Sequence, residues 1–165
     1  MEERFTGILN NNKDAIYRIC KAYATDEEHT RDLFQDVLLN IWRSLPGFKE
    51  LSAVNTWVYR ITLNVCIRAK HNADRHHQPV HLDSITWDYL PASNDEDNRH
   101  RYNELYACIY KLNEADKLLV LLFLEDLPYK DIAAVAGISE NHVAVKLKRI
   151  KAKLFNCLNE NGYDG

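Results

Sequence analysis

Apolar residues recur at intervals of three and four along most of the chain, the spacing that places them on one side of an α-helix. In the N-terminal part this pattern predicts helices over residues 3–23, 26–45 and 53–71. In the C-terminal part it predicts helices over residues 98–111, 114–125, 128–136 and 139–160. Few stretches alternate apolar and polar residues as half-buried strands do. We therefore expect an all-α protein.

The segment between these two groups of helices is acidic and polar. Residues 72–100 carry two basic and six acidic residues, whereas basic and acidic residues are nearly balanced on both sides of it. The segment also contains two of the four prolines, and it lacks the apolar surface needed to fold alone. We predict two small helical domains, residues 1–71 and 98–165, joined by a flexible acidic linker, residues 72–97.

The composition is that of a soluble globular protein, with 165 residues, 46% hydrophobic residues and a formal net charge of −3. The longest apolar run, Leu118–Leu124, is far shorter than the roughly 20 residues of a membrane-spanning helix. The first residues lack the apolar segment of a secretory signal. We therefore expect a cytoplasmic protein with no direct membrane insertion.

The four cysteines are far apart in the sequence, and each lies in a helical apolar pattern. No C-x-x-C pair is present. We expect small, buried, apolar residues in a reducing compartment at Cys20, Cys66, Cys108 and Cys157.

Residues 128–154 carry the sharpest local motif. Pro128 suits the start of a helix, Gly137 suits a tight turn, and Ser139 is a good N-cap for the next helix. Small apolar residues precede the turn at Ile132, Ala133 and Ala136. An apolar stripe follows it at Val143, Leu147, Ile150 and Leu154. This is the pattern of a helix-turn-helix that reads duplex DNA.

The second helix of this motif is strongly basic. Residues 141–153 hold five positive charges and no negative one, in a chain that is acidic overall. The polar face of this helix shows Asn141, His142, Val145, Lys148 and Arg149, flanked by Lys146, Lys151 and Lys153. An ordinary solvated helix end with lysines favoured by the helix dipole is the alternative. The turn that precedes the basic helix favours DNA binding.

Two segments of the first domain carry candidate binding chemistry. In residues 32–45, inward-facing apolar residues are expected at Phe34, Leu38, Ile41 and Leu45. We expect a shared outer face at Asp32, Gln35, Asp36, Leu39 and Arg43. Such a face suits a protein partner that carries arginines, and a plain solvated surface is the alternative.

Residues 55–67 place aromatic residues, Arg60 and Asn64 on one helix. Aromatic and amide side chains together can stack on unpaired bases and hydrogen-bond to them. The alternative is a core helix whose Trp and Tyr residues only pack.

Together these segments resemble the sigma-70 family of bacterial transcription initiation factors, and within it the small extracytoplasmic-function (ECF) group. The resemblance rests on D-L-F-Q-D-V at residues 32–37, T-W-V-Y-R-I-T-L-N-V-C at residues 56–66, and the helix-turn-helix sequence at residues 127–150. It implies a non-catalytic subunit without cofactor or metal. This subunit binds core RNA polymerase and promoter DNA and directs initiation.

The resemblance also implies roles for individual residues. The face that binds the largest polymerase subunit is expected at Asp32, Gln35, Asp36 and Leu39. The pocket for a flipped base of the −10 element is expected at Phe48 and Asn64, with strand separation supported by Trp57, Tyr59 and Arg60. The −35 element is expected to meet Asn141, His142, Val145, Lys146 and Arg149. Members of the ECF group are commonly held by an anti-sigma factor, often a membrane-bound one.

Some questions stay open at this point. Many relatives have Thr where this chain has His142, so the DNA sequence recognised at the −35 element is not determined. The inducing signal and the identity of an anti-sigma factor are also undetermined. A stand-alone helix-turn-helix repressor or activator is the main alternative function. Four histidines within eleven residues, His71, His76, His77 and His81, raise the idea of a zinc site or a small metal-dependent enzyme. No cysteine lies near them, so we expect no metal.

Overall fold

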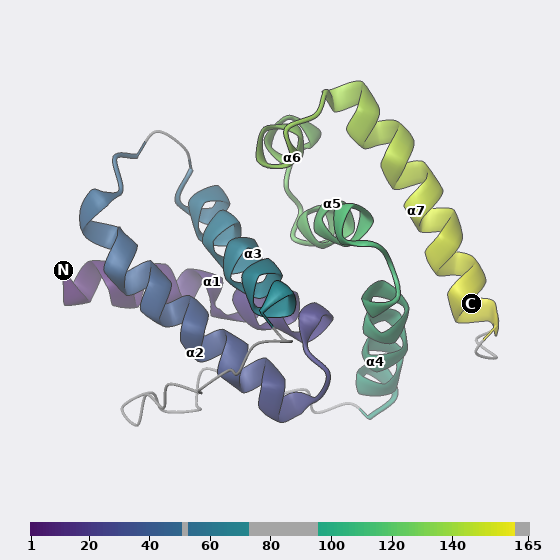
Figure 1. The fold of residues 1–165 in the computed structure, drawn as a ribbon, viewed down its shortest axis with the longest axis horizontal. Helices are drawn as coiled ribbons and strands as arrows, with labels where there is room; N and C mark the ends of the chain where they lie inside the picture. The colour runs from purple at the N-terminus through teal and green to yellow at the C-terminus, as the bar shows by residue number, and fades with distance from the viewer. Residues whose placement is uncertain (51–52, 73–95, 161–165) are drawn as a thin grey trace. The chain divides into compact units, whose positions relative to one another are not determined.

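In the computed structural model, the described residues are 1–50, 53–72 and 96–160, and their regular structure is α-helical apart from one short 3₁₀ turn (Figure 1). The all-α expectation is confirmed. The chain divides into two compact units, Met1–Pro91 and Ala92–Gly165. Within the described residues, no helix is long and apolar enough to span a membrane.

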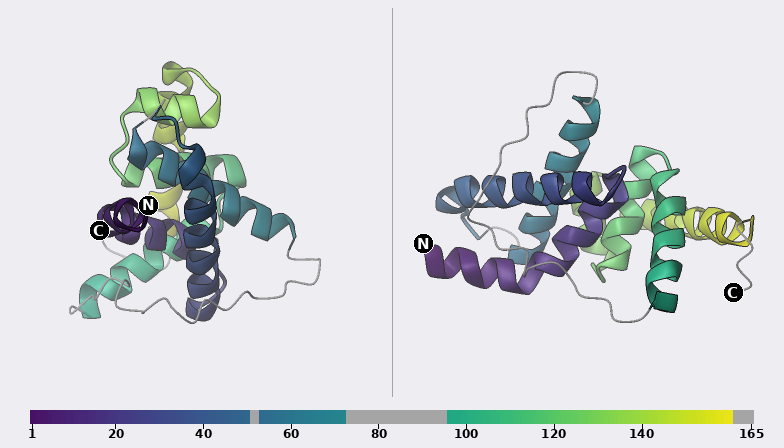
Figure 2. Two further views of the ribbon diagram at one scale, coloured as in Figure 1. Left: turned by 90° about the vertical axis from the view of Figure 1, so that its left-hand side faces the viewer. Right: turned by 90° about the horizontal axis from the view of Figure 1, so that it is seen from below.

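The described residues of the first unit form three long helices, which pack against one another (Figures 1 and 2). They are α1 (Glu2–Tyr23), α2 (Glu27–Ser44) and α3 (Val54–His71), with the 3₁₀ turn η1 (Leu45–Gly47) directly after α2. Asp26 begins α2 because its carboxylate accepts a hydrogen bond of 2.7 Å from the His29 backbone N–H. Ile16, Phe34 and Val58, one from each helix, are fully buried and form the centre of the core.

Residues 96–160, the described part of the second unit, form four helices. They are α4 (Glu96–Tyr110), α5 (Glu114–Leu124), α6 (Tyr129–Ala136) and α7 (Glu140–Glu160). Helices α5, α6 and α7 pack pairwise, and α4 packs against α7. The Asn113 side chain caps α5 by accepting a hydrogen bond of 2.9 Å from the Asp116 backbone N–H.

Each of the seven expected helices is present, with its ends within two residues of the expected ones. Helix α4 begins at Glu96, so the last two residues of the expected linker are helical. Of the rest of that linker, residue 72 is described directly after α3, and residues 73–95 lie outside the described part of the chain.

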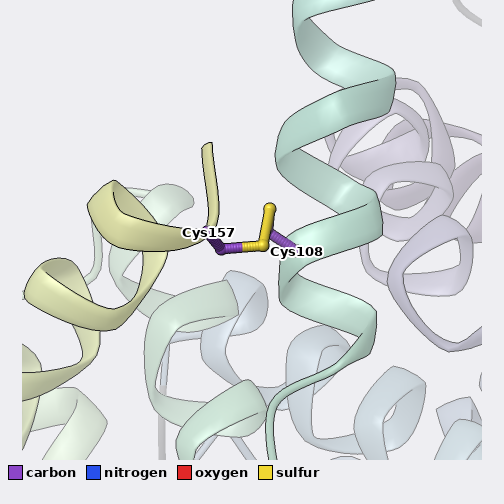
Figure 3. The surroundings of a disulfide bond; sticks show 2 residues. All are labelled: Cys108 and Cys157. Atoms are coloured by element: carbon purple, nitrogen blue, oxygen red, sulfur yellow. A yellow bond between two sulfur atoms is a disulfide. The ribbon is translucent and has the colours of Figure 1, made fainter. Parts of the chain in front are cut away.

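The expectation of buried residues without a disulfide is confirmed for one pair of cysteines and wrong for the other, which is bonded; the expected reducing compartment stays a prediction. Cys20 and Cys66 are free and buried. Cys108 and Cys157 instead form a disulfide between α4 and α7, with their Cα atoms 6.0 Å apart (Figure 3). The two residues are 49 positions apart, and only the packing of α7 against α4 brings them together.

Candidate partner-binding and nucleic-acid interfaces

Helix α2 lies in contact with both α1 and α3, and this widens the side that it buries. The four expected inward residues, Phe34, Leu38, Ile41 and Leu45, are all buried, as are Leu33 and Val37. Gln35 is also buried, with 6% of its surface exposed. Its expected place on the outer face is therefore wrong, because a helix packed on two neighbours hides flanking positions as well as a central stripe.

The outer face of α2 is formed by the remaining expected residues. Asp32, Asp36 and Leu39 are half-buried, and Arg43 is exposed. Around the helix axis these four positions fall within one narrow sector at 100° per residue. Two carboxylates beside an apolar side chain can receive charge-assisted hydrogen bonds from cationic groups of a partner protein.

Phe48, directly after η1, reaches the start of α3. Its ring lies on the Trp57 ring, with centroids 4.4 Å apart and planes tilted by 31°. The Arg4 guanidinium carbon lies 5.5 Å from the centre of the Phe48 ring, and the Arg4 guanidinium also pairs with Glu50 at 3.1 Å. Phe48 and Trp57 thus form one aromatic platform, with a cation from α1 beside it.

The exposed side of α3 carries a polar stripe. Arg60, Asn64 and Arg68 are exposed at intervals of four residues, which places them on one face. Asn64 lies seven residues after Trp57, about 10 Å further along the helix axis. A nucleic-acid strand along this face would meet the aromatic platform first and the amide of Asn64 two turns later.

Tyr59 does not share that face. It is 7% exposed and belongs to the core of the first unit, next to the fully buried Val58. For this residue the alternative of a packing aromatic is correct, because α3, like α2, contacts two helices. Trp57, in contrast, is half-buried and remains partly accessible.

The second unit has the expected helix-turn-helix geometry. Gly137 ends α6 with φ 73° and ψ 31°, a left-handed conformation that strains residues with a Cβ atom. The Ser139 hydroxyl accepts a hydrogen bond of 3.1 Å from the His142 backbone N–H and so begins α7. Pro128 precedes the first helical residue of α6, one position earlier than its expected place. The stripe at Val143, Leu147, Ile150 and Leu154 is buried, as expected.

The outer side of α7 presents most of the predicted DNA-reading residues. Asn141, His142, Val145 and Arg149 are exposed, and Lys146 is half-buried. Val145 is an apolar residue with half of its surface exposed, as a contact to a thymine methyl group requires.

Two of the five positive charges of residues 141–153 contact groups within the second unit. The Lys151 ammonium lies 4.1 Å from the centre of the Phe123 ring. The Lys153 ammonium pairs at 3.0 Å with the Asp116 carboxylate, whose side chain is 8% exposed. Among the residues that the structure describes, the other three positive charges, Lys146, Lys148 and Arg149, make no such contact within the second unit, whereas Lys151 and Lys153 remain exposed despite theirs.

The idea of a histidine metal site gains no support from the described residues. His71 is exposed at the end of α3, and His76, His77 and His81 lie outside the described part of the chain. Among the residues that the structure describes, no group of three His, Cys, Asp or Glu side chains could hold a metal ion.

Sequence reasoning missed two contacts of interest. Arg4 and Glu50 meet beside Phe48 although they are 46 residues apart, and no local pattern signals this. The disulfide had a partial signal, because Cys157 continues the apolar stripe of α7 three residues after Leu154. This spacing places Cys157 on the side of α7 that packs against the rest of the unit.

Comparison with known proteins gives matches on both units. Residues 8–76 match the family Sigma-70 region 2, and residues 102–154 match the family Sigma-70, region 4. The ECF RNA polymerase sigma factor SigM of Mycobacterium tuberculosis is 21% identical over 155 residues, which are 93% of this chain and 76% of that protein.

Two solved structures share the fold at 17% sequence identity. One is CnrH in complex with the cytosolic domain of CnrY, with a TM-score of 0.71 over 97% of this chain and 90% of that one. The other is the sigma factor RpoE in complex with the anti-sigma factor NepR from Bartonella quintana, with a TM-score of 0.66 over 95% of this chain and 98% of that one.

Proposed function

The chain belongs to the sigma-70 family, in its ECF group, and on this premise we propose how its two units divide the work of promoter-specific initiation. As a sigma factor it binds core RNA polymerase and directs transcription initiation at promoters. The first unit holds the polymerase and reads the melted −10 element. The second unit reads the −35 element as duplex DNA.

One observation carries this proposal. The region 2 and region 4 matches occur in order, and each falls on its own unit of the chain. A stand-alone helix-turn-helix regulator accounts for α6 and α7 equally well, but it gives no reason for a region 2 match in the first unit. The sigma factor is therefore the better supported function, and the family does its work without chemistry of its own.

In the first unit, we assign polymerase binding to the outer face of α2. Asp32, Asp36 and Leu39 make the direct contacts, and the buried Gln35 supports the helix from beneath. The platform of Phe48 and Trp57 offers an aromatic surface for an unstacked base. Asn64 can donate and accept hydrogen bonds at once and so can read a base edge.

Arg60 joins the −10 site as a cation on the same face of α3 as Asn64. A positive charge there attracts the phosphates of the separated strand, which positions the strand without reading its sequence. Tyr59 acts through the core that holds α3 in place rather than by direct contact.

In the second unit, the start of α7 enters the major groove of the −35 element. Asn141, His142, Val145 and Arg149 face the base edges, and Lys146 and Lys148 meet phosphates. The capping bond from the His142 backbone N–H to Ser139 fixes the N-terminal turn of the helix, where base contacts are made.

We further propose that an anti-sigma factor holds this protein inactive in the cytoplasm. The support is that both similar structures contain a second protein, which one of them names as an anti-sigma factor. A binding partner that covers the polymerase face or the DNA face would block initiation.

A binding titration with core RNA polymerase tests the assignment of the α2 face. We expect Asp32→Ala with Asp36→Ala to weaken binding by about tenfold or more, because charge-assisted hydrogen bonds are lost. The matched control is Glu3→Ala with Asp14→Ala, which removes the same charge from exposed positions of α1.

Circular dichroism of both double variants checks that the fold is kept. Equal affinity of the α2 variant and the control for core polymerase would refute the assignment of this face.

A further inference from the structure

The four cysteines of the chain form two pairs, one in each unit. Cys108 and Cys157 are joined by the disulfide between α4 and α7 (Figure 3). Cys20 of α1 and Cys66 of α3 face each other with their sulfur atoms 3.9 Å apart and remain free thiols. The chain therefore contains one bonded pair and one unbonded pair.

The two pairs differ in their access to solvent. Cys157 is half-buried, whereas Cys20 and Cys66 are 0% and 1% exposed. Burial also raises the pKa of the Cys20 thiol well above its ordinary value, and the hydrogen bond to Cys66 adds to this shift. Exchange between thiols and disulfides needs an accessible sulfur and a thiolate. Cys108 is 2% exposed, so Cys157 is the one residue of the two pairs through which a small redox molecule would reach a sulfur atom.

The bond lies where it can stabilise the DNA-reading unit. The loop that it closes contains α5, α6 and most of α7, and so the whole helix-turn-helix. It also fastens α4 to α7, the helix against which α4 packs. Cys157 lies eight residues after Arg149, about 12 Å along the axis of the same helix. Closing such a loop restricts the unfolded chain and favours the folded unit.

We propose that Cys108 and Cys157 are a reversible redox modification site whose ligands are low-molecular-weight thiols and disulfides of the glutathione type. One step of this argument rests on the proposed function, which places the chain with RNA polymerase in a reducing compartment. Disulfides of mesophilic proteins in that compartment are mostly transient or redox-sensing rather than permanent. The bond is then a state of the protein that changes with the thiol pool.

The exchange balances in two steps. A small thiolate attacks the sulfur of Cys157, the more exposed partner, and the protein disulfide breaks. Cys108 leaves as a thiolate and takes up a proton. A second small thiolate attacks the small-molecule sulfur of the mixed disulfide and forms the small disulfide; Cys157 leaves as a thiolate and takes up a proton. Two small thiols thus become one small disulfide, and the reverse reaction uses that small disulfide as the oxidant.

The test uses the full chain with reduced or oxidised glutathione, and needs neither polymerase nor promoter. Protein is equilibrated with each form, denatured, alkylated and weighed by mass spectrometry. We expect two alkylated thiols per oxidised chain and four per reduced chain. Failure of this chemistry would leave the proposed function untouched, so the two can be distinguished.

Thermal melting then measures how much the disulfide stabilises the second unit. All three tryptophans lie in the first 91 residues, so fluorescence follows the first unit, while circular dichroism follows both. We expect reduction to lower the melting temperature of the second unit by about 10 °C or more, without moving the fluorescence transition. Oxidised glutathione should restore the original value.

Two variants serve as controls. Cys157→Ser should remove the response to glutathione, whereas Cys66→Ala should keep it. The wild-type protein in its two redox states gives the main result even if a variant fails to fold. The proposal is overturned if millimolar glutathione leaves the thiol count unchanged, or if both redox states melt at the same temperature.

Discussion

The lysines of α7 are close together in sequence, but they differ in their contacts within the second unit. Lys153 pairs at 3.0 Å with Asp116, a carboxylate buried at the start of α5. Lys148 is exposed on the side that faces away from the core. We therefore predict that Lys153→Ala lowers the stability of the second unit, whereas Lys148→Ala weakens DNA binding.

The size of the stability effect follows from the exposure of the two partners. The side chain of Asp116 is 8% exposed and that of Lys153 is 58% exposed, so solvent screens only one side of the pair. A hydrogen bond to a charged group contributes about 1.5–3 kcal/mol to stability, and an exposed ion pair contributes about 0.2–1 kcal/mol. We therefore expect the loss of this half-exposed pair to cost about 1–2 kcal/mol. The Asn113 side-chain amide, 3.2 Å from the same carboxylate oxygen, keeps one partner in place and limits the loss.

For a unit of this size, the expected loss corresponds to a fall of about 5–10 °C in the melting temperature. Lys148→Ala should change stability by no more than about 0.5 kcal/mol. It should, however, lower the slope of log affinity against log salt by about one for −35 duplex DNA, since one phosphate contact is lost.

The assay pairs melting by circular dichroism with DNA titrations across a salt series, for both variants and the parent. The reasoning predicts a crossed result, in which each variant changes one property and not the other. If Lys153→Ala lowers the slope of log affinity against log salt and keeps the parent's melting temperature, then Lys153 serves DNA binding rather than stability, and the prediction is refuted.

Two further predictions concern the expected pocket for an unpaired base and two glycines in different backbone conformations. On a promoter with a pre-melted −10 bubble, Asn64→Ala should lose discrimination at one base position by roughly 1–3 kcal/mol. Asn55 is also exposed on α3, and Asn55→Ala should keep that discrimination. Equal base preference in both variants would rule out the pocket. Gly137→Ala should destabilise the second unit by about 1–2 kcal/mol, because the φ of 73° strains a residue with a Cβ atom. No atom lies within 4 Å of the added Cβ, so the backbone conformation alone accounts for this cost. Gly7→Ala, equally unobstructed but inside α1, should stabilise the first unit by about 1 kcal/mol, and melting curves that move in the same direction for both would contradict this reading.

The helices could be predicted from sequence because each carries its own local signals. Ser139 marks the start of α7, Gly137 marks the end of α6, and the stripe from Val143 to Leu154 defines the buried side. Such signals act over a few residues and do not depend on the rest of the fold. For this reason the amino-acid sequence alone predicts the helix-turn-helix and the exposed residues of its second helix.

The errors arise where a residue depends on a partner distant in sequence. The local pattern places Gln35 and Tyr59 at interfaces, but both are buried, because α2 and α3 each pack against two helices. The bond between Cys108 and Cys157 depends on the docking of α4 onto α7, which no local pattern reveals.

Counting the positive charges of a helix from the sequence has the same limit, since contacts with distant residues are not visible in it. Residues 141–153 carry five positive charges in the sequence, yet Lys151 and Lys153 contact Phe123 and Asp116 of α5. The count treats all five charges alike, because the sequence does not show which side chains a neighbouring helix contacts.

The measurement that tests the account most directly is whether the protein makes core RNA polymerase selective. Core enzyme free of sigma factors, from the organism that encodes this chain, is mixed with that organism's genomic DNA with or without the protein, and RNA 5′ ends are mapped. The account predicts 5′ ends that appear only with the protein and share two upstream sequence blocks, at the −35 and −10 positions. The same set of 5′ ends with and without the protein would contradict it.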